Sequence, residues 1–122
     1  MHHVYILGYI ETIHSKLFQI LLNVEELERS HLKLQDRWYG QDIVYKSDTI
    51  DFFVYGNELD ESEEKLFFDC EYKKSMCEAH AFVNTLMQVL KEANVPAFQF
   101  DYGQQDEDGN EIGEQFEVRS TT

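Results

Sequence analysis

Basic residues are scarce in this sequence. Its 122 residues include 10 Lys plus Arg against 24 Asp plus Glu, which gives a formal net charge of −14 at pH 7. Contacts to nucleic-acid phosphates are made mainly by Lys and Arg, and anionic membrane surfaces attract the same side chains. We therefore expect no direct binding to nucleic acid and no docking on a membrane.

Cysteines and long apolar runs are also scarce. Only Cys70 and Cys77 are present, which is too few for a disulfide framework, so we expect two reduced thiols. No apolar stretch approaches the roughly 20 residues that a membrane-spanning helix needs. The first ten residues have no positively charged region ahead of a short apolar stretch, which favours a strand over an export signal. These features predict a cytoplasmic protein.

Motifs for metals and cofactors are missing as well. The six glycines do not cluster into a phosphate-binding loop, and no Cys-x-x-Cys or His-Glu-x-x-His spacing supports zinc. The acidic run around Gly109 has some features of a calcium loop, but Gln104 and Gln115 stand at its first and twelfth positions, where the motif needs acids. Asp108-Gly109 fits a hairpin turn better. We expect no metal and no cofactor.

A catalytic site is no better supported. Cys77 and His80 lie three residues apart on a predicted helix and could be drawn as a thiolate and its base. The same spacing places any two side chains next to each other on a helix, whatever their chemistry. No Gly-x-Ser-x-Gly turn occurs, and the acids are too numerous to single out a catalytic pair. The sequence therefore predicts a protein that is not an enzyme.

Two segments have the periodicity of amphipathic helices. The first begins near Ile13 and is expected to fade between residues 30 and 34. The second begins at a capping box, Ser75 to Glu78, in which each side chain can satisfy a free backbone N–H. Asn94 can adopt the left-handed conformation that ends a helix, and Pro96 blocks its continuation.

Runs of β-branched and aromatic residues predict six strands, at 4–10, 43–45, 50–55, 65–72, 97–102 and 112–118. The first run is almost continuously apolar, which predicts a central strand that is buried on both faces. The order is β-α-β-β-β-α-β-β. We expect one α+β domain over residues 1–122, a two-layer α/β sandwich with a mostly antiparallel sheet and both helices on one face. Residues 119–122 are expected to fray.

Negative charge is concentrated in the second half of the chain. Residues 1–50 hold 7 acids and 5 bases, whereas residues 51–122 hold 17 acids and 5 bases. A solvated surface is the simplest interpretation of such acids, and a partner-binding surface is the functional one. The acids that we assign to partner binding lie in a loop and in the turn of the last hairpin: Glu58, Asp60, Glu61, Glu63, Glu64, Asp106, Glu107, Asp108 and Glu111.

Aromatic residues are the second unusual feature, at 14% of the chain. Trp38 and Tyr39 stand together in a predicted turn and are candidate anchors for a partner. Strand alternation places Phe53, Tyr55 and Phe67 on one sheet face together with two acids. If both helices cover the other face, this face stays open and suits a protein interface or a dimer contact.

Two hypotheses for the function follow. The first is an acidic protein-binding domain that sequesters or inhibits a basic protein, such as a nuclease or another nucleic-acid-binding protein. Immunity proteins, antitoxins and phage inhibitors share its size and charge, and one form of the hypothesis is a nucleic-acid mimic. The alternative is a homodimeric α+β domain that binds a small ligand or has a regulatory role.

Overall fold

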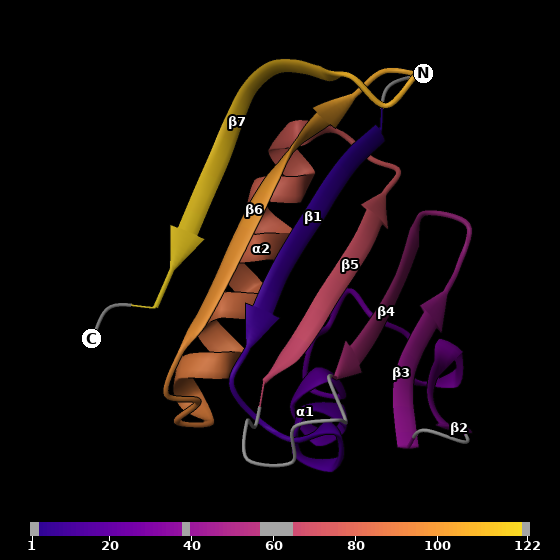
Figure 1. Ribbon diagram of the computed structural model, residues 1–122, viewed down its shortest axis with the longest axis vertical. Helices are drawn as coiled ribbons and strands as arrows, with labels where there is room; N and C mark the ends of the chain where they lie inside the picture. The colour runs from indigo at the N-terminus through magenta and orange to yellow at the C-terminus, as the bar shows by residue number, and fades with distance from the viewer. Residues whose placement is uncertain (1–2, 38–39, 57–64, 121–122) are drawn as a thin grey trace.

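A single antiparallel sheet of seven strands forms one layer of the computed structural model, which describes residues 3–37, 40–56 and 65–120 (Figure 1). The strands lie side by side in the order β2-β3-β4-β5-β1-β6-β7, so the N-terminal strand is central. Their bounds are β1 His3–Ile10, β2 Leu32–Arg37, β3 Gly40–Lys46, β4 Ile50–Gly56, β5 Leu66–Tyr72, β6 Phe98–Gln105 and β7 Glu111–Arg119.

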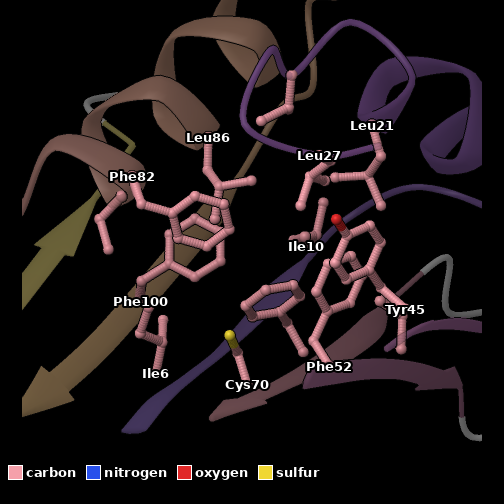
Figure 2. Packing of buried hydrophobic residues seen from close by; sticks show 14 of the residues in the cluster. Ile6, Ile10, Leu21, Leu27, Tyr45, Phe52, Cys70, Phe82, Leu86 and Phe100 are labelled. Atoms are coloured by element: carbon pink, nitrogen blue, oxygen red, sulfur yellow. The ribbon is translucent and has the colours of Figure 1, made fainter. Parts of the chain in front are cut away.

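Two helices form the second layer. They are α1 (His14–Leu21) and α2 (Met76–Glu92), and a short 3-10 turn, η1, spans Arg29–His31. Figure 2 shows both helices on the same side of the strands, with the buried side chains between the layers. The predicted two-layer α+β sandwich is confirmed, and the predicted elements occur in the predicted order. Among the described residues, no helix has the length and apolar character that crossing a membrane requires.

Aromatic side chains fill much of the space between the layers. Phe68 lies 5.1 Å from Phe52 and 5.6 Å from Phe100, measured between ring centroids, so three strands contribute to one row of rings. Phe82 of α2 stacks on Tyr72 at 5.1 Å. Large rings bury much apolar area per residue, and their mutual contacts fix how α2 sits on the sheet.

The second helix begins and ends where the sequence predicts. Ser75 is its N-cap, and the Ser75 hydroxyl oxygen accepts a hydrogen bond from the backbone N–H of Glu78 at 3.1 Å. The Ser75 hydroxyl also lies 3.0 Å from the Glu78 carboxylate. After the helix, Asn94 has φ of 60°. This left-handed residue ends the helix.

The first helix is shorter than predicted. It ends at Leu21, and turns carry the chain through residues 22–28 to η1 and then to β2, a strand that the sequence did not predict. Val24 and Leu27, which continue the apolar spacing of the helix, are buried in this irregular segment. The apolar spacing therefore predicted correctly that Val24 and Leu27 are buried, but it was wrong in predicting that they are helical.

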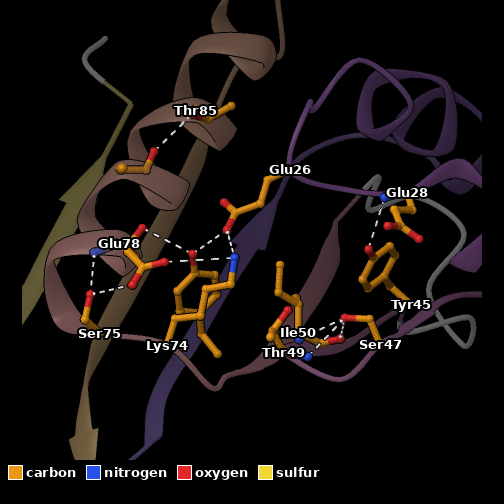
Figure 3. Close-up of polar contacts among 12 residues, drawn as sticks. Glu26, Glu28, Tyr45, Ser47, Thr49, Ile50, Lys74, Ser75, Glu78 and Thr85 are labelled. Atoms are coloured by element: carbon orange, nitrogen blue, oxygen red, sulfur yellow. Dashed lines mark hydrogen bonds and ion pairs between the residues drawn. The ribbon is translucent and has the colours of Figure 1, made fainter.

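Two tyrosine hydroxyls hold this irregular segment in place. Tyr45 accepts a hydrogen bond from the backbone N–H of Glu28 at 3.0 Å, and Tyr72 donates to the Glu26 carboxylate at 2.5 Å. Lys74 also binds the Glu26 carboxylate, at 3.1 Å (Figure 3). Burial, followed by the bond to Glu26, raises the pKa of Tyr72, so its hydroxyl stays a donor.

The C-terminal strand is held further than predicted. Strand β7 continues to Arg119, and Ser120 exchanges two hydrogen bonds with Phe98, at 2.8 Å and 3.0 Å. The fraying expected at residues 119 and 120 is therefore wrong, because the end of β7 pairs with the start of β6. Residues 121–122 lie outside the described part of the chain.

Candidate protein-binding face

Most of the side chains assigned to partner binding from the sequence lie outside the described residues. These are Trp38 and Tyr39, and the loop acids Glu58, Asp60, Glu61, Glu63 and Glu64. Their assignment stays a prediction.

The hairpin acids have different roles from one another. The Asp106 carboxylate accepts hydrogen bonds from the backbone N–H groups of Asp108 and Asn110, each at 2.9 Å, so it shapes the turn. Glu107 and Asp108 are exposed at the tip of the turn. Glu111 begins β7 and pairs with Gln105 of β6. Asp106 is therefore engaged within the turn, whereas Glu107, Asp108 and Glu111 are exposed.

The sheet surface that faces away from the helices carries several exposed apolar side chains; we call it the open face. Leu7 is 49% exposed and Phe53 is 45% exposed, and Tyr55 and Phe67 are also exposed. Alternation along β4 and β5 predicted the three aromatic residues on this face, together with Asp51 and Asp69, and the structure confirms it. Exposed apolar side chains that lie together mark interaction surfaces more often than scattered ones do.

Strand β1 differs from its prediction. It is central, as expected, but only one of its faces is buried: Val4 and Ile6 point into the core, whereas Leu7 is half exposed on the open face. The expectation of burial on both faces is wrong because both helices pack on the same side. The tyrosines at positions 5 and 9, each with a polar tip, were the sequence signal that this side meets water.

The register of the strands places these side chains in rows across the open face. One row runs through Phe53, Asp69, Leu7, Asp101 and Glu117, on β4, β5, β1, β6 and β7. Neighbouring strands are about 4.8 Å apart, so Leu7 lies between two carboxylates on adjacent strands. Apolar and acidic side chains therefore alternate from Phe53 to Asp101, and Glu117 adds a second acid at the end of the row.

The next row is richer in aromatic rings. It runs through Tyr55, Phe67 and Tyr9 on β4, β5 and β1. The Tyr55 ring centroid lies 5.6 Å from that of Phe67 and 5.4 Å from that of Phe53, so the rings form a continuous strip. Lys65 places its Nζ atom 4.3 Å from the centre of the Tyr9 ring, a cation–π contact.

Some carboxylates of the open face have basic partners within the chain. Asp51 pairs with Lys73 at 2.8 Å, and Glu117 pairs with Arg119 at 2.8 Å. The hydrogen bond to Asp51 raises the pKa of Lys73 and so keeps it charged. The negative charge of this face is therefore partly neutralised at its margins.

Asp69 is different from those paired acids. Across the described ranges, neither Asp69 nor Asp101 forms an ion pair. Partial burial raises the pKa of Asp69, whose neighbours in the row are Phe53 and Leu7. A partly buried carboxylate without an ion-pair partner gains more from binding a cation than one that is already paired.

Two shallow hollows lie on the open face and meet at Tyr5. One, of about 290 Å³, is lined by Phe53 and Asp69 among others. The other, of about 390 Å³, lies over β6, where Leu7 and Asp101 contribute to its lining. Both combine apolar or aromatic side chains with carboxylates in their lining.

A larger hollow, of about 640 Å³, lies beside the irregular segment after α1 and shares Tyr45 and Lys46 with the hollow near Phe53. Some of its charged groups are paired with one another, whereas Lys46 and Asp48 line it without an ion pair among the described residues. Glu26 binds Lys74 at 3.1 Å, and Glu28 lies 3.0 Å from the ring of His31. This hollow lacks the exposed aromatic side chains that the open face carries.

The groups considered for catalysis lie apart from the open face. Cys77 is exposed on α2, and the His80 ring nitrogen Nδ1 meets the Tyr102 hydroxyl at 2.6 Å. Within the described ranges, no group of three or more His, Cys, Asp or Glu side chains could hold a metal ion.

Comparisons with protein-family models, with curated proteins and with solved structures found no match to this chain.

Proposed function

We propose that this chain is a protein-binding domain without catalytic activity, which sequesters a basic protein by covering part of that protein with its open face. The observation that carries the proposal is the row in which Leu7 lies half exposed between Asp69 and Asp101. The apolar side chain offers area to bury, and the carboxylates offer charge to pair.

The aromatic strip beside this row supports the proposal. Phe53, Tyr55 and Phe67 are exposed, and the Tyr55 ring contacts the other two. Aromatic residues dominate the binding energy of many interfaces because they bury much area with little loss of side-chain freedom. A strip of this kind, with acids beside it, has the composition of an interface centre.

The charge of the whole chain favours a basic partner. A net charge of −14 attracts basic proteins from a distance and speeds their association, while it repels a second copy of the same chain. Glu107 and Asp108 at the hairpin tip would contribute to this attraction. A nuclease or another nucleic-acid-binding protein presents the basic surface that this face fits. The homodimer stays the alternative.

We place this activity in the cytoplasm. Both cysteines are free, and Cys77 is exposed to solvent. An exposed thiol suits a reducing compartment, where it is not oxidised to a disulfide.

Two double variants with the same charge change would test the proposal. Asp69→Asn with Asp101→Asn removes two charges from the open face, and Glu107→Gln with Asp108→Asn removes two from the hairpin tip. The immobilised wild-type chain is exposed to a lysate of its source organism at low salt and eluted with a salt gradient. We expect a basic protein that elutes as the salt rises, because screening weakens its attraction. We expect the open-face variant to lose it and the hairpin variant to keep most of it.

Three outcomes would contradict the proposal. The wild-type chain retains no basic protein, both variants bind equally well, or the hairpin variant loses the partner first. Sedimentation of the purified chain at several concentrations tests the alternative. A stable dimer that buries the aromatic strip would replace the basic partner as the occupant of the open face.

A further inference from the structure

We propose that the open face holds an arginine side chain of the partner at Asp69, with the guanidinium stacked on the Phe53 ring and donating hydrogen bonds to the Asp69 carboxylate. This inference rests on the proposed function, because it names the chemistry by which the basic partner is recognised. The site is the hollow of about 290 Å³ that Phe53, Asp69 and Tyr5 help to line.

The surroundings of Asp69 suit a flat cation. Phe53 and Leu7 stand beside it on the two neighbouring strands, and Phe67 lies two residues before it on the same strand and face. Adjacent strands are about 4.8 Å apart and alternate residues about 6.7 Å apart, so apolar groups approach the carboxylate from three sides. Glu71 lies on the fourth side, where its carboxylate contacts the His3 ring nitrogen Nδ1, and Lys46 also lines the same hollow.

The rings of this face already attract one cation. Lys65 places Nζ 4.3 Å from the Tyr9 centroid and 5.9 Å from the Phe67 centroid. This internal contact shows that the ring faces are accessible to a positive charge from the solvent side. Phe53 lies on the neighbouring strand β4, and its exposed ring can receive a cation from outside the chain in the same way.

Arginine matches this arrangement better than lysine does. Its guanidinium is planar and weakly hydrated, so it can stack on a ring while its N–H groups donate in the same plane. A lysine ammonium is a compact, strongly hydrated charge that cannot do both. Asp69 is partly buried and has no ion-pair partner among the described residues, so an arginine that reaches it supplies the missing counter-charge.

The test uses single amino-acid probes with the complete chain. The ¹⁵N-labelled protein is titrated with N-acetyl-L-arginine amide and, separately, with N-acetyl-L-lysine amide, and amide shifts are followed by NMR. We expect the arginine probe to shift amides around Asp69, Phe53 and Leu7, and to bind at least about threefold more tightly than the lysine probe.

Two variants and a matched control locate the site. Asp69→Asn should weaken arginine binding by about tenfold, because a charge-assisted hydrogen bond is lost. Phe53→Leu keeps an apolar side chain but removes the ring, so the preference for arginine over lysine should disappear. Asp108→Asn, which removes the same charge from the hairpin tip, should change the affinity by less than about twofold.

Lys65 gives a second, independent readout. Lys65→Met removes the internal cation from the rings and should raise the affinity for the arginine probe by about two- to threefold. Lys91→Met, which makes the same charge change on the exposed side of α2, serves as the control and should have a smaller effect.

Equal affinity for the two probes, or shifts centred on the hairpin turn, would overturn the arginine site. An Asp108→Asn effect as large as that of Asp69→Asn would also overturn it. If the lysate partner is still lost with the open-face double variant, only the arginine site fails and the proposed function stands. If no basic partner binds at all, the function fails whatever the probes show.

Discussion

Adjacent residues on β1 should respond very differently to truncation if the open face is free in solution. Ile6 is 0% exposed and packs under the helices, whereas Leu7 is 49% exposed and points the other way. We compare Ile6→Ala with Leu7→Ala because both lie in the centre of the same central strand. Any general weakening of β1 by alanine is therefore shared between them.

The expected magnitudes follow from burial. Truncation of a fully buried Ile removes its transfer free energy and leaves a cavity, at a cost of about 2–5 kcal/mol in the free energy of unfolding. Full burial of a Leu contributes about 1.5–3 kcal/mol, and Leu7 keeps only about half of that contact. No closed cavity forms at the surface, so Leu7→Ala should cost about half of that range, about 1 kcal/mol.

Equilibrium unfolding in urea, at two protein concentrations tenfold apart, measures both values. The reasoning is refuted if Leu7→Ala costs as much as Ile6→Ala at both concentrations, because Leu7 would then be covered within the chain. A cost that grows with protein concentration would show that a second copy covers it, since association makes stability depend on concentration. Either result would mean that the open face is already covered and cannot bind the proposed partner.

Three further predictions concern other groups. Ser75→Ala removes the hydrogen bond to the Glu78 N–H and should lower stability by about 1 kcal/mol, seen as a lower Tm; an unchanged Tm would contradict the cap. In the native chain Cys77 should react at once with a thiol reagent, whereas Cys70, which is buried and has a raised pKa, should react only after unfolding. Because burial raises the pKa of Asp69, the folded state binds its proton more readily than the unfolded state, and this term lowers stability as the pH rises through that pKa. Asp69→Asn should therefore be more stable than the wild type at pH 7, and the difference should vanish below about pH 4, near the ordinary aspartate pKa.

Signals contained within a few residues were predicted correctly from the sequence. The capping box at Ser75 and the stop at Asn94 depend on local hydrogen bonds and backbone conformation, so the sequence carries them in full. The same holds for the hairpin turn, where Gly109 has φ of 82°.

The end of the first helix could not be predicted in the same way. Val24 and Leu27 keep helical spacing, yet nothing in the local sequence stops the helix at Leu21. The segment beyond is held by tertiary contacts: the Tyr72 hydroxyl that binds Glu26 lies 46 residues away in the chain. Such a tertiary contact overrides helical propensity, and the spacing of apolar residues in the local sequence cannot predict it.

The candidate site was predicted in part. Alternation within β4 and β5 placed Phe53 and Asp69 on one face correctly, because parity is a property of the strand itself. Leu7 and Asp101 were missed because they join that face only through the pairing of β1 with β5 and β6. Strand neighbours are set by the whole fold, and the sequence did not identify which strands are adjacent.

The chemistry of the open face constrains what can cover it. A partner that is only apolar would bury the Asp69 carboxylate without a counter-charge, and the penalty for an unpaired buried charge would exceed the gain from covering Leu7. A second copy of the chain brings its own acids and repeats the same difficulty. A partner that places a cation next to an apolar group covers Leu7 and neutralises Asp69 in one step. The exposure of Leu7 and the lost hydration of Asp69 are separate disadvantages of the free protein, and they lie on adjacent strands where one such contact relieves both.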